Sequence, residues 1–161
     1  MRKMIAITIC LASSATVFAQ EETGVVVNGV TWATCNVGAS TPEGYGNYYN
    51  FDEAQRACPT GWRTPTREEF YKLEDAASVW TMQNGVNGRR FGSGENTIFL
   101  PAAGFRFHSK SKFHGRDAGG NYWANTVTGK NGYHLAFNDA AGVYIFNYHK
   151  TVVMSVRCVK E

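Results

Sequence analysis

The stretch ACPTGWRTPTREEFYKL, residues 57–73, places a cysteine and a tryptophan directly before what reads as the start of a helix. Thr66 and Glu69 have the spacing of a capping box, in which the side chain of each residue accepts a hydrogen bond from the backbone N–H of the other. Pro65 favours an extended approach to that helix. The apolar residues that recur every three or four positions would form one buried helix face: Phe70, Leu73, Ala77 and Trp80. The stretch predicts a strand or turn that leads into a capped amphipathic helix.

Two local signals lie upstream of this helix. Asn28-Gly29 stands between two short apolar runs, which predicts a hairpin with a tight turn. Residues 50–59, NFDEAQRACP, predict a short helix that is capped by Asn50 or Asp52 and stopped by Pro59. Two helices are therefore expected in the first half of the chain.

After Gly85 the apolar residues alternate with polar ones, as they do in strands. The runs are TIFLPAAGF (97–105), NYWANTV (121–127), YHLAFN (133–138), VYIFNY (143–148) and VVMSVRCVK (152–160). Short polar connections join the later runs, so an antiparallel sheet is expected. Helices come early and strands late, which is typical of an α+β fold.

The first 19 residues have the pattern of a secretory signal peptide. Arg2 and Lys3 form a positive start, an apolar segment at residues 5–12 follows, and Val17-Phe18-Ala19 offers a cleavage site. We expect cleavage after Ala19 and a single domain at residues 20–161. Such a protein would be exported to the periplasm, the cell surface or the medium.

The net charge argues against a nucleic-acid partner, and the length of the apolar runs argues against a membrane span. The formal net charge is +3, of which Arg2 and Lys3 contribute two, so residues 20–161 carry +1. This value gives little support to nucleic-acid binding, and no nucleic-acid partner is expected. No later apolar run reaches the roughly 18 residues that a membrane-spanning helix needs, so no membrane span is expected either.

Three cysteines follow the expected cleavage site: Cys35, Cys58 and Cys158. An oxidising compartment favours one disulfide and one odd thiol among them. The sequence by itself leaves all three pairings open.

Motifs of enzymes and metal sites are absent from the sequence. It contains no Gly-x-Ser-x-Gly, no His-Glu-x-x-His, no phosphate-binding loop and no Cys-x-x-Cys. The four histidines, His108, His114, His134 and His149, do not have the spacing of metal ligands. We therefore expect no enzymatic activity, no cofactor and no metal.

Basic residues occupy even positions in RFHSKSKFHGR, residues 106–116: Arg106, His108, Lys110, Lys112, His114 and Arg116. An extended chain would place all six on one face. A hairpin with its tip near residues 109–111 would crowd them onto one exposed ribbon. The segment is either a solvated hairpin whose phenylalanines cover the core or a binding patch for anionic groups.

The C-terminal third combines aromatic residues with asparagines, as recognition surfaces do. The candidate ligand-binding residues are Trp123, Asn125, Tyr133, Asn138, Tyr144, Asn147, Tyr148 and His149. The alternative is that half of these side chains point into the core and that the asparagines fill turns.

Five segments of the chain resemble one known family, in the family's own order. They are VNGVTWATCNVGA (27–39), ACPTGWRTPTREEF (57–70), LPAAGF (100–105), GNYWANT (120–126) and SVRCVK (155–160). Together they resemble the Fibrobacter succinogenes major paralogous domain family, which is common in secreted proteins of gut Bacteroidota-type bacteria.

That family is similar in turn to the C-type lectin-like superfamily, which includes the formylglycine-generating enzymes. The resemblance implies a C-type lectin-like α+β fold, with two N-terminal helices packed on a twisted antiparallel sheet with long loops. It also implies a Cys58–Cys158 disulfide, which leaves Cys35 as the odd thiol. The segment around Gly61–Phe70 is structural in the enzymes of that superfamily.

The sequence departs from the functional motifs of these relatives. The Glu-Pro-Asn and Gln-Pro-Asp motifs of calcium-dependent lectins are missing, and only Cys158 lies where the oxidases carry a cysteine pair. We therefore expect an exported, non-enzymatic binding module that recognises a glycan, a peptide or a surface protein through its C-terminal face. The alternatives are a structural module that assembles with envelope or appendage proteins, and a degenerate oxidase-type enzyme.

Overall fold

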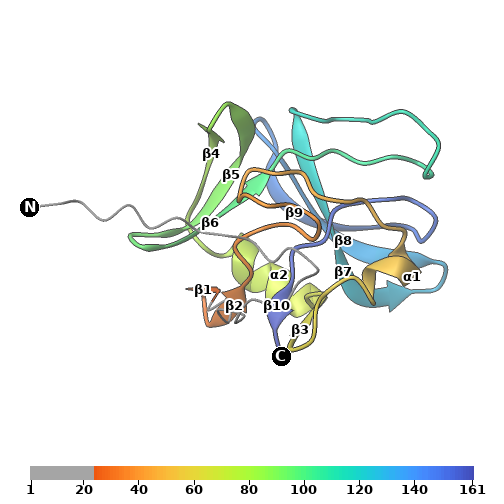
Figure 1. Ribbon diagram of the computed structural model, residues 1–161, viewed down its shortest axis with the longest axis horizontal. Helices are drawn as coiled ribbons and strands as arrows, with labels where there is room; N and C mark the ends of the chain where they lie inside the picture. The colour runs from red at the N-terminus through yellow and green to blue at the C-terminus, as the bar shows by residue number, and fades with distance from the viewer. Residues whose placement is uncertain (1–23) are drawn as a thin grey trace, which may run out of the picture.

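The computed structural model describes residues 24–161, which form ten strands and two short helices (Figure 1). In chain order the elements are β1 (Val25–Val27), β2 (Val30–Trp32), α1 (Phe51–Ala54), β3 (Trp62–Arg63), α2 (Arg67–Glu74), β4 (Ser78–Gln83), β5 (Val86–Ser93), β6 (Asn96–Pro101), β7 (Gly119–Thr128), β8 (Asn131–Asn138), β9 (Gly142–His149) and β10 (Val159–Lys160). The predicted signal peptide lies outside the described residues.

The fold is mostly β, and the predicted α+β fold with two N-terminal helices packed on one sheet is wrong. The strands form three small antiparallel sheets, with the orders β1-β2-β10-β3, β4-β5-β6 and β7-β8-β9. Only 9% of the structure is helical. In Figure 1 the β4–β6 sheet and the β7–β9 sheet stand on opposite sides of the molecule, and α2 lies below and between them.

The second helix is short because strand-forming residues follow it closely. The capping boxes at Asn50–Glu53 and Thr66–Glu69 both form, so the predicted helix starts are confirmed. The second helix, however, ends at Glu74, and Trp80 belongs to β4. β4 pairs with β5 across a turn at Asn84-Gly85, where both residues have positive φ (48° and 81°). That hairpin is stabilised by six residue pairs that a longer helix would forfeit.

The C-terminal segment, residues 152–160, joins parts of the chain that are far apart in sequence. β10 pairs with both β2 and β3. Before it, Val153 forms a bridge with Arg106, Met154 with Tyr49, and Ser155 with Tyr122. The run predicted here as a regular strand is therefore mostly a set of isolated bridges.

Buried Arg157 also links the C-terminal segment to distant parts of the chain. Its guanidinium donates hydrogen bonds to the Asn36 side chain (2.9 Å) and to the backbone carbonyls of Ala33, Thr34 and Phe99 (3.0–3.1 Å). A fork of five N–H donors suits such a cluster of carbonyl oxygens. Arg157 is a structural residue rather than a ligand-binding one.

Two apolar clusters make up the core. One gathers side chains of β1, β2, α2, β5, β6, β7 and β8, including Trp32, Phe70, Phe91 and Phe137. The other lies around α1 and the C-terminal segment, and its largest members are Trp62 and Trp123. In the described part of the chain, no helix is long and apolar enough to cross a membrane.

The Cys58–Cys158 disulfide is present, as the family resemblance implied, and it links residues 100 positions apart. Cys35 is disulfide-bonded as well, and no cysteine among the described residues is free. The prediction of an odd thiol at Cys35 is therefore wrong for the chain in this structure.

Candidate functional site

The β7-β8-β9 sheet carries most of the predicted ligand-binding residues, but it divides them between its two faces. Because side chains alternate along a strand, Tyr133 and Asn147 point to the face that packs on the core with Leu135. Tyr144, Phe146 and Tyr148 point to the other face, together with His134. We call this second face the arm face, because residues 105–114 pack against it.

Several predicted site residues have structural roles instead. Trp123 is fully buried in the second core cluster, so its prediction as a binding residue is not supported by its position. The side chain of Asn138 accepts a hydrogen bond from the backbone N–H of Ala141 in the β8–β9 turn (2.6 Å). Asn125 and His149 are exposed, and His149 contacts the hydroxyl of Thr151 (2.9 Å).

Residues 105–114 form a hairpin arm, which projects in the upper right of Figure 1. Phe105 pairs with His114, so their side chains point to the same side and their rings stack with centroids 5.6 Å apart. The next pair, Arg106 and Phe113, points to the opposite side. Of the two alternatives, the hairpin is thus the one that forms, and because its register pairs even positions with odd ones, the six basic residues do not share one face.

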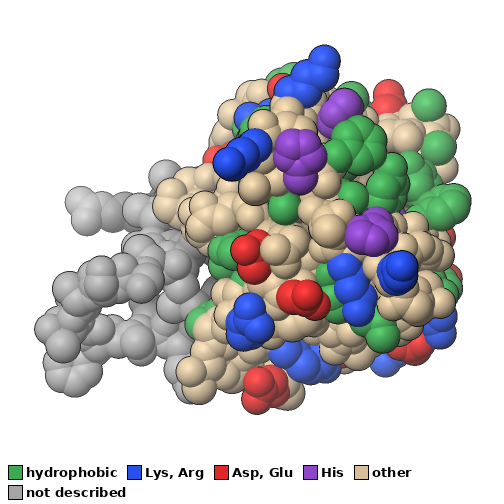
Figure 2. Space-filling model, turned by 90° about the vertical axis from the view of Figure 1, so that its right-hand side faces the viewer, with side chains coloured by type: hydrophobic (Ala, Val, Ile, Leu, Met, Phe, Trp, Pro, Cys, Tyr) green, Lys and Arg blue, Asp and Glu red, His purple; other side chains and the backbone are tan. Residues whose placement is uncertain are grey.

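An aromatic strip runs over the arm face. It consists of Phe105 and Phe107 from the arm and Tyr144, Phe146 and Tyr148 from β9. The Tyr148 ring lies 5.9 Å from that of Phe105 and 6.2 Å from that of Phe107. Phe107, Phe146 and Tyr148 are 44%, 58% and 37% exposed, which makes the strip an accessible apolar surface. Figure 2 shows hydrophobic side chains gathered beside histidines on this side of the molecule.

β9 is an edge strand of its sheet. It pairs with β8 along eight residue pairs, and within the described residues no backbone hydrogen bond reaches the opposite edge between Val143 and Tyr148. An unpaired strand edge offers N–H and C=O groups to another extended chain. The aromatic strip therefore lies beside free backbone hydrogen-bonding groups.

Below the strip, His134 is buried between Trp123 and Tyr148, with ring centroids 6.0 and 6.2 Å away. Desolvation lowers the pKa of its imidazole to about 4, and its Nδ1 atom has no hydrogen-bond partner among the described residues. His134 is therefore neutral at pH 7 and supports the strip from beneath.

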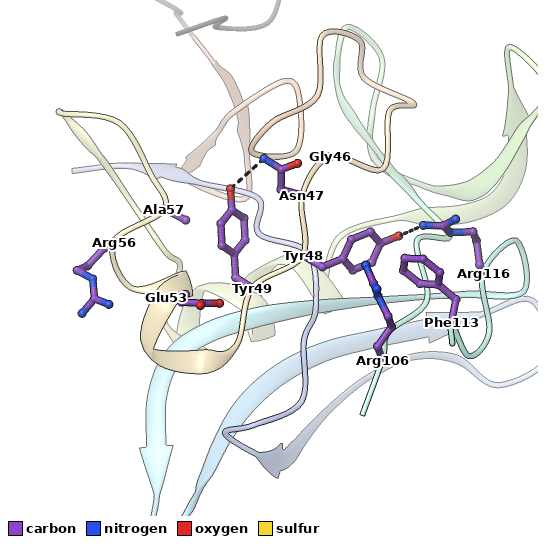
Figure 3. Close-up of a pocket in the computed structure, with 10 residues that line it drawn as sticks. All are labelled: Gly46, Asn47, Tyr48, Tyr49, Glu53, Arg56, Ala57, Arg106, Phe113 and Arg116. Carbon is purple, nitrogen blue, oxygen red and sulfur yellow. Dashed lines mark hydrogen bonds between the residues drawn. The ribbon is translucent and has the colours of Figure 1, made fainter. Parts of the chain in front are cut away.

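A second feature lies on the other side of the arm. It is an open pocket with a volume of about 810 Å³ (Figure 3). Its lining comprises Gly46, Asn47, Tyr48, Tyr49, Glu53, Arg56, Ala57, Arg106, Phe113 and Arg116. In Figure 3 the side chains of Tyr48, Arg106, Phe113 and Arg116 converge at one end, whereas Glu53 and Arg56 stand at the other. We call it the arginine pocket.

Tyr48 anchors the arginine end of this pocket. Its hydroxyl donates a hydrogen bond to the Ala103 carbonyl (2.6 Å) and accepts one from the Arg116 guanidinium (3.1 Å). Burial raises the pKa of Tyr48, and the hydrogen bond from Arg116 opposes that rise. The neutral phenol of Tyr48 therefore holds the Arg116 guanidinium in place through this hydrogen bond.

Neither feature has the composition of a metal centre. Over residues 24–161, no group of three or more His, Cys, Asp or Glu side chains lies close enough to hold a metal ion. The arginine pocket instead offers positive charge, and the aromatic strip offers apolar area. These are properties of binding surfaces.

Sequence reasoning identified Tyr144 and Tyr148 but missed Phe107, Phe146 and the arginine pocket. Phe146 could have been found, since it shares its strand face with both tyrosines at a spacing of two. The pocket could not, because Tyr48 and Arg106 come from segments that meet only in the folded chain.

No curated protein and no solved structure is similar enough to this chain to be matched with it. A family model does match: the Fibrobacter succinogenes major domain covers residues 14–160. The match includes every strand and both helices described above, and it ends at residue 160, one residue before the end of the sequence. The chain therefore belongs to the Fibrobacter succinogenes major domain family.

Proposed function

We propose that this protein is an exported, non-enzymatic binding module that recognises an extended peptide segment of a partner protein through the edge of β9. The observation that carries the proposal is the aromatic strip beside an unpaired strand edge. A partner strand would add backbone hydrogen bonds to β9 and pack apolar side chains on the strip.

The spacing of the strip suits such a ligand. Tyr144, Phe146 and Tyr148 are two residues apart along one strand, which corresponds to a repeat of roughly 7 Å. Same-face side chains of an added strand have the same repeat, so each could lie opposite or between the rings of β9. Exposed apolar area of this kind marks interaction sites on soluble proteins.

Export is supported by the disulfide chemistry. Structural disulfides persist in oxidising compartments, and Cys58–Cys158 is buried at its Cys158 end. The oxidase-type alternative depends on a free thiol at Cys158, which this bond consumes. Assembly with envelope or appendage proteins would use the same edge of β9. A glycan would instead stack on the aromatic strip and would not use the backbone groups of β9.

The proposal can be tested by selecting ligands on the full chain. A phage-displayed library of linear peptides would be selected on the immobilised protein, and the enriched peptides would be measured by fluorescence anisotropy. We expect enriched sequences with apolar residues at alternate positions. Amide hydrogen exchange should show new protection within Gly142–His149 when a peptide binds.

The double variant Phe146→Ala/Tyr148→Ala should weaken peptide binding at least tenfold without unfolding the domain. Tyr71→Ala is the matched control, because Tyr71 is a 43% exposed aromatic residue on α2. Equal affinity of the double variant and the unaltered chain would place the ligand elsewhere. Enrichment of peptides without alternating apolar residues would count against strand addition.

A further inference from the structure

We propose that the arginine pocket is a second binding site, separate from the β9 edge, and that it takes an acidic oligosaccharide whose carboxylates pair with Arg106 and Arg116, one with each guanidinium. The two sites are on opposite sides of the hairpin arm, because Phe105 and Arg106 point in opposite directions. The pocket therefore goes beyond the proposed peptide recognition and does not depend on it.

The pocket has an excess of positive charge. Three arginines and one glutamate line it. The Glu53 carboxylate accepts a hydrogen bond from the backbone N–H of Asn50 (3.0 Å). Ion pairs in the described part of the chain join Arg63 to Glu69 and Arg67 to Glu68, and none involves an arginine of the pocket. The positive charge of Arg106 and Arg116 is available to a ligand.

The two arginines are held in position by one ring. The guanidinium carbons of Arg116 and Arg106 lie 3.4 and 4.1 Å from the ring centroid of Phe113. Two guanidinium groups so near one ring centre would collide on the same face, so they lie on opposite faces. Cation–π attraction and the tilted Tyr48 ring, 4.7 Å from that of Phe113, keep both groups in place.

Donors remain free after the contacts within the protein are counted. Arg116 uses Nη2 for the Tyr48 hydroxyl (3.1 Å), and Arg106 uses Nη1 for the Ser109 carbonyl (2.8 Å). The Nε of Arg106 is buried without a hydrogen-bond partner among the described residues, so the donors that a ligand can reach are the remaining terminal N–H groups. Arginine is suited to planar anions because its parallel N–H groups match a carboxylate. Each guanidinium thus keeps donors for an anionic group.

The rest of the pocket favours a saccharide over a peptide. Beyond the arginines, the lining offers the Asn47 amide, the Tyr49 phenol and the Glu53 carboxylate, which combine donors and acceptors for hydroxyl groups. Few apolar side chains are available there to bury those of a peptide. A volume of about 810 Å³ lies within the range of small-ligand sites.

Isothermal titration calorimetry with oligogalacturonate would test the proposal, with the fully methyl-esterified oligomer as the neutral counterpart. We expect binding of the acid form, no binding of the ester, and an affinity that falls as sodium chloride is raised. Arg116→Gln should weaken binding at least tenfold, and Arg116→Lys should recover part of the loss. Arg106→Gln should act in the same direction, with folding checked by thermal melting.

Arg90→Gln is the matched control, because it removes the same charge from β5, in another sheet. Equal binding of acid and ester, or unchanged affinity in both Arg106→Gln and Arg116→Gln, would overturn the site. Equally tight binding of polyglutamate would overturn its assignment to saccharides. The Phe146→Ala/Tyr148→Ala variant should bind oligogalacturonate normally, so failure of this proposal and failure of peptide recognition can be told apart.

Discussion

Trp123 donates a hydrogen bond from its indole nitrogen to the backbone carbonyl of Tyr49 (2.9 Å). Its ring also packs edge-on against Phe51, with centroids 5.4 Å apart. Trp123 thus fastens β7 to the start of α1, although it lies on the strand face that carries the candidate ligand residues. Because Trp123 is buried, it has a structural role on this face, whereas Phe146 and Tyr148 on the same face are exposed to a ligand.

Trp123→Phe should therefore lower the free energy of unfolding by about 2 kcal/mol, through a lost hydrogen bond and a cavity. Urea denaturation would measure the change. Trp80→Phe is the comparison, because the half-buried Trp80 should cost less. A variant as stable as the unaltered chain would contradict the anchoring role.

Replacing both Cys58 and Cys158 by alanine should lower the stability by about 4–5 kcal/mol, because their bond closes a loop of 100 residues. Guanidinium denaturation of the oxidised chain and of the double variant would give the difference. A non-reducing peptide map must first show the Cys58–Cys158 peptide in the unaltered protein. Equal midpoints would mean that the closed loop contributes nothing to stability.

Buried His134 should make stability depend on pH. Its pKa of about 4 in the folded chain lies below its ordinary value of about 6.5, so the unfolded chain binds the proton more readily. The stabilising contribution is complete above pH 6.5 and is lost as the pH falls toward 4. The loss amounts to about 3 kcal/mol over that interval.

His134→Gln should reduce this pH dependence relative to the unaltered chain. Unfolding free energies measured in urea between pH 7 and pH 4 would show the slope for each chain. Identical slopes for His134→Gln and the unaltered chain would refute the assignment, because the acidic residues are common to both.

Arg157→Lys should cost about 2 kcal/mol or more, even though the charge is retained. A single ammonium group cannot reach Asn36, Ala33 and Phe99 at once, so buried acceptors would lose their donors. Thermal denaturation would compare it with Arg90→Lys on β5, for which a change within about 0.5 kcal/mol is expected. A similar loss of stability in both variants would argue against the role of the several guanidinium hydrogen bonds of Arg157.

Local features of the fold were predictable from sequence. The Asn28-Gly29 hairpin and the capping box of Thr66 and Glu69 depend on residues within a few positions of each other, and both are confirmed. Strand β4 was mispredicted as helix because Phe70, Leu73, Ala77 and Trp80 mimic a helical period. The Asn84-Gly85 turn carried the correcting signal, since it has the same residue types as the first hairpin.

The candidate site was predictable only where it follows one strand. Tyr144 and Tyr148 share a face by alternation, and the structure keeps them on one face. The structure buries Trp123 and exposes Tyr148. This difference depends on which segments pack over each strand, and the alternation of side chains along a strand does not predict that packing. The division of the basic residues likewise depends on the pairing of Phe105 with His114, a register that the sequence leaves undetermined.

The C-terminal segment has a consequence for the order of events during biosynthesis. β10 supplies the middle strand between β2 and β3, and Cys158 supplies half of the disulfide. A chain that is still being synthesised lacks this strand, so the first sheet cannot close until the last residues have emerged. Closure of this sheet and formation of the Cys58–Cys158 bond therefore both wait for residues 158–160, so the two events are coupled. In the exported protein that we propose, both would take place after translocation.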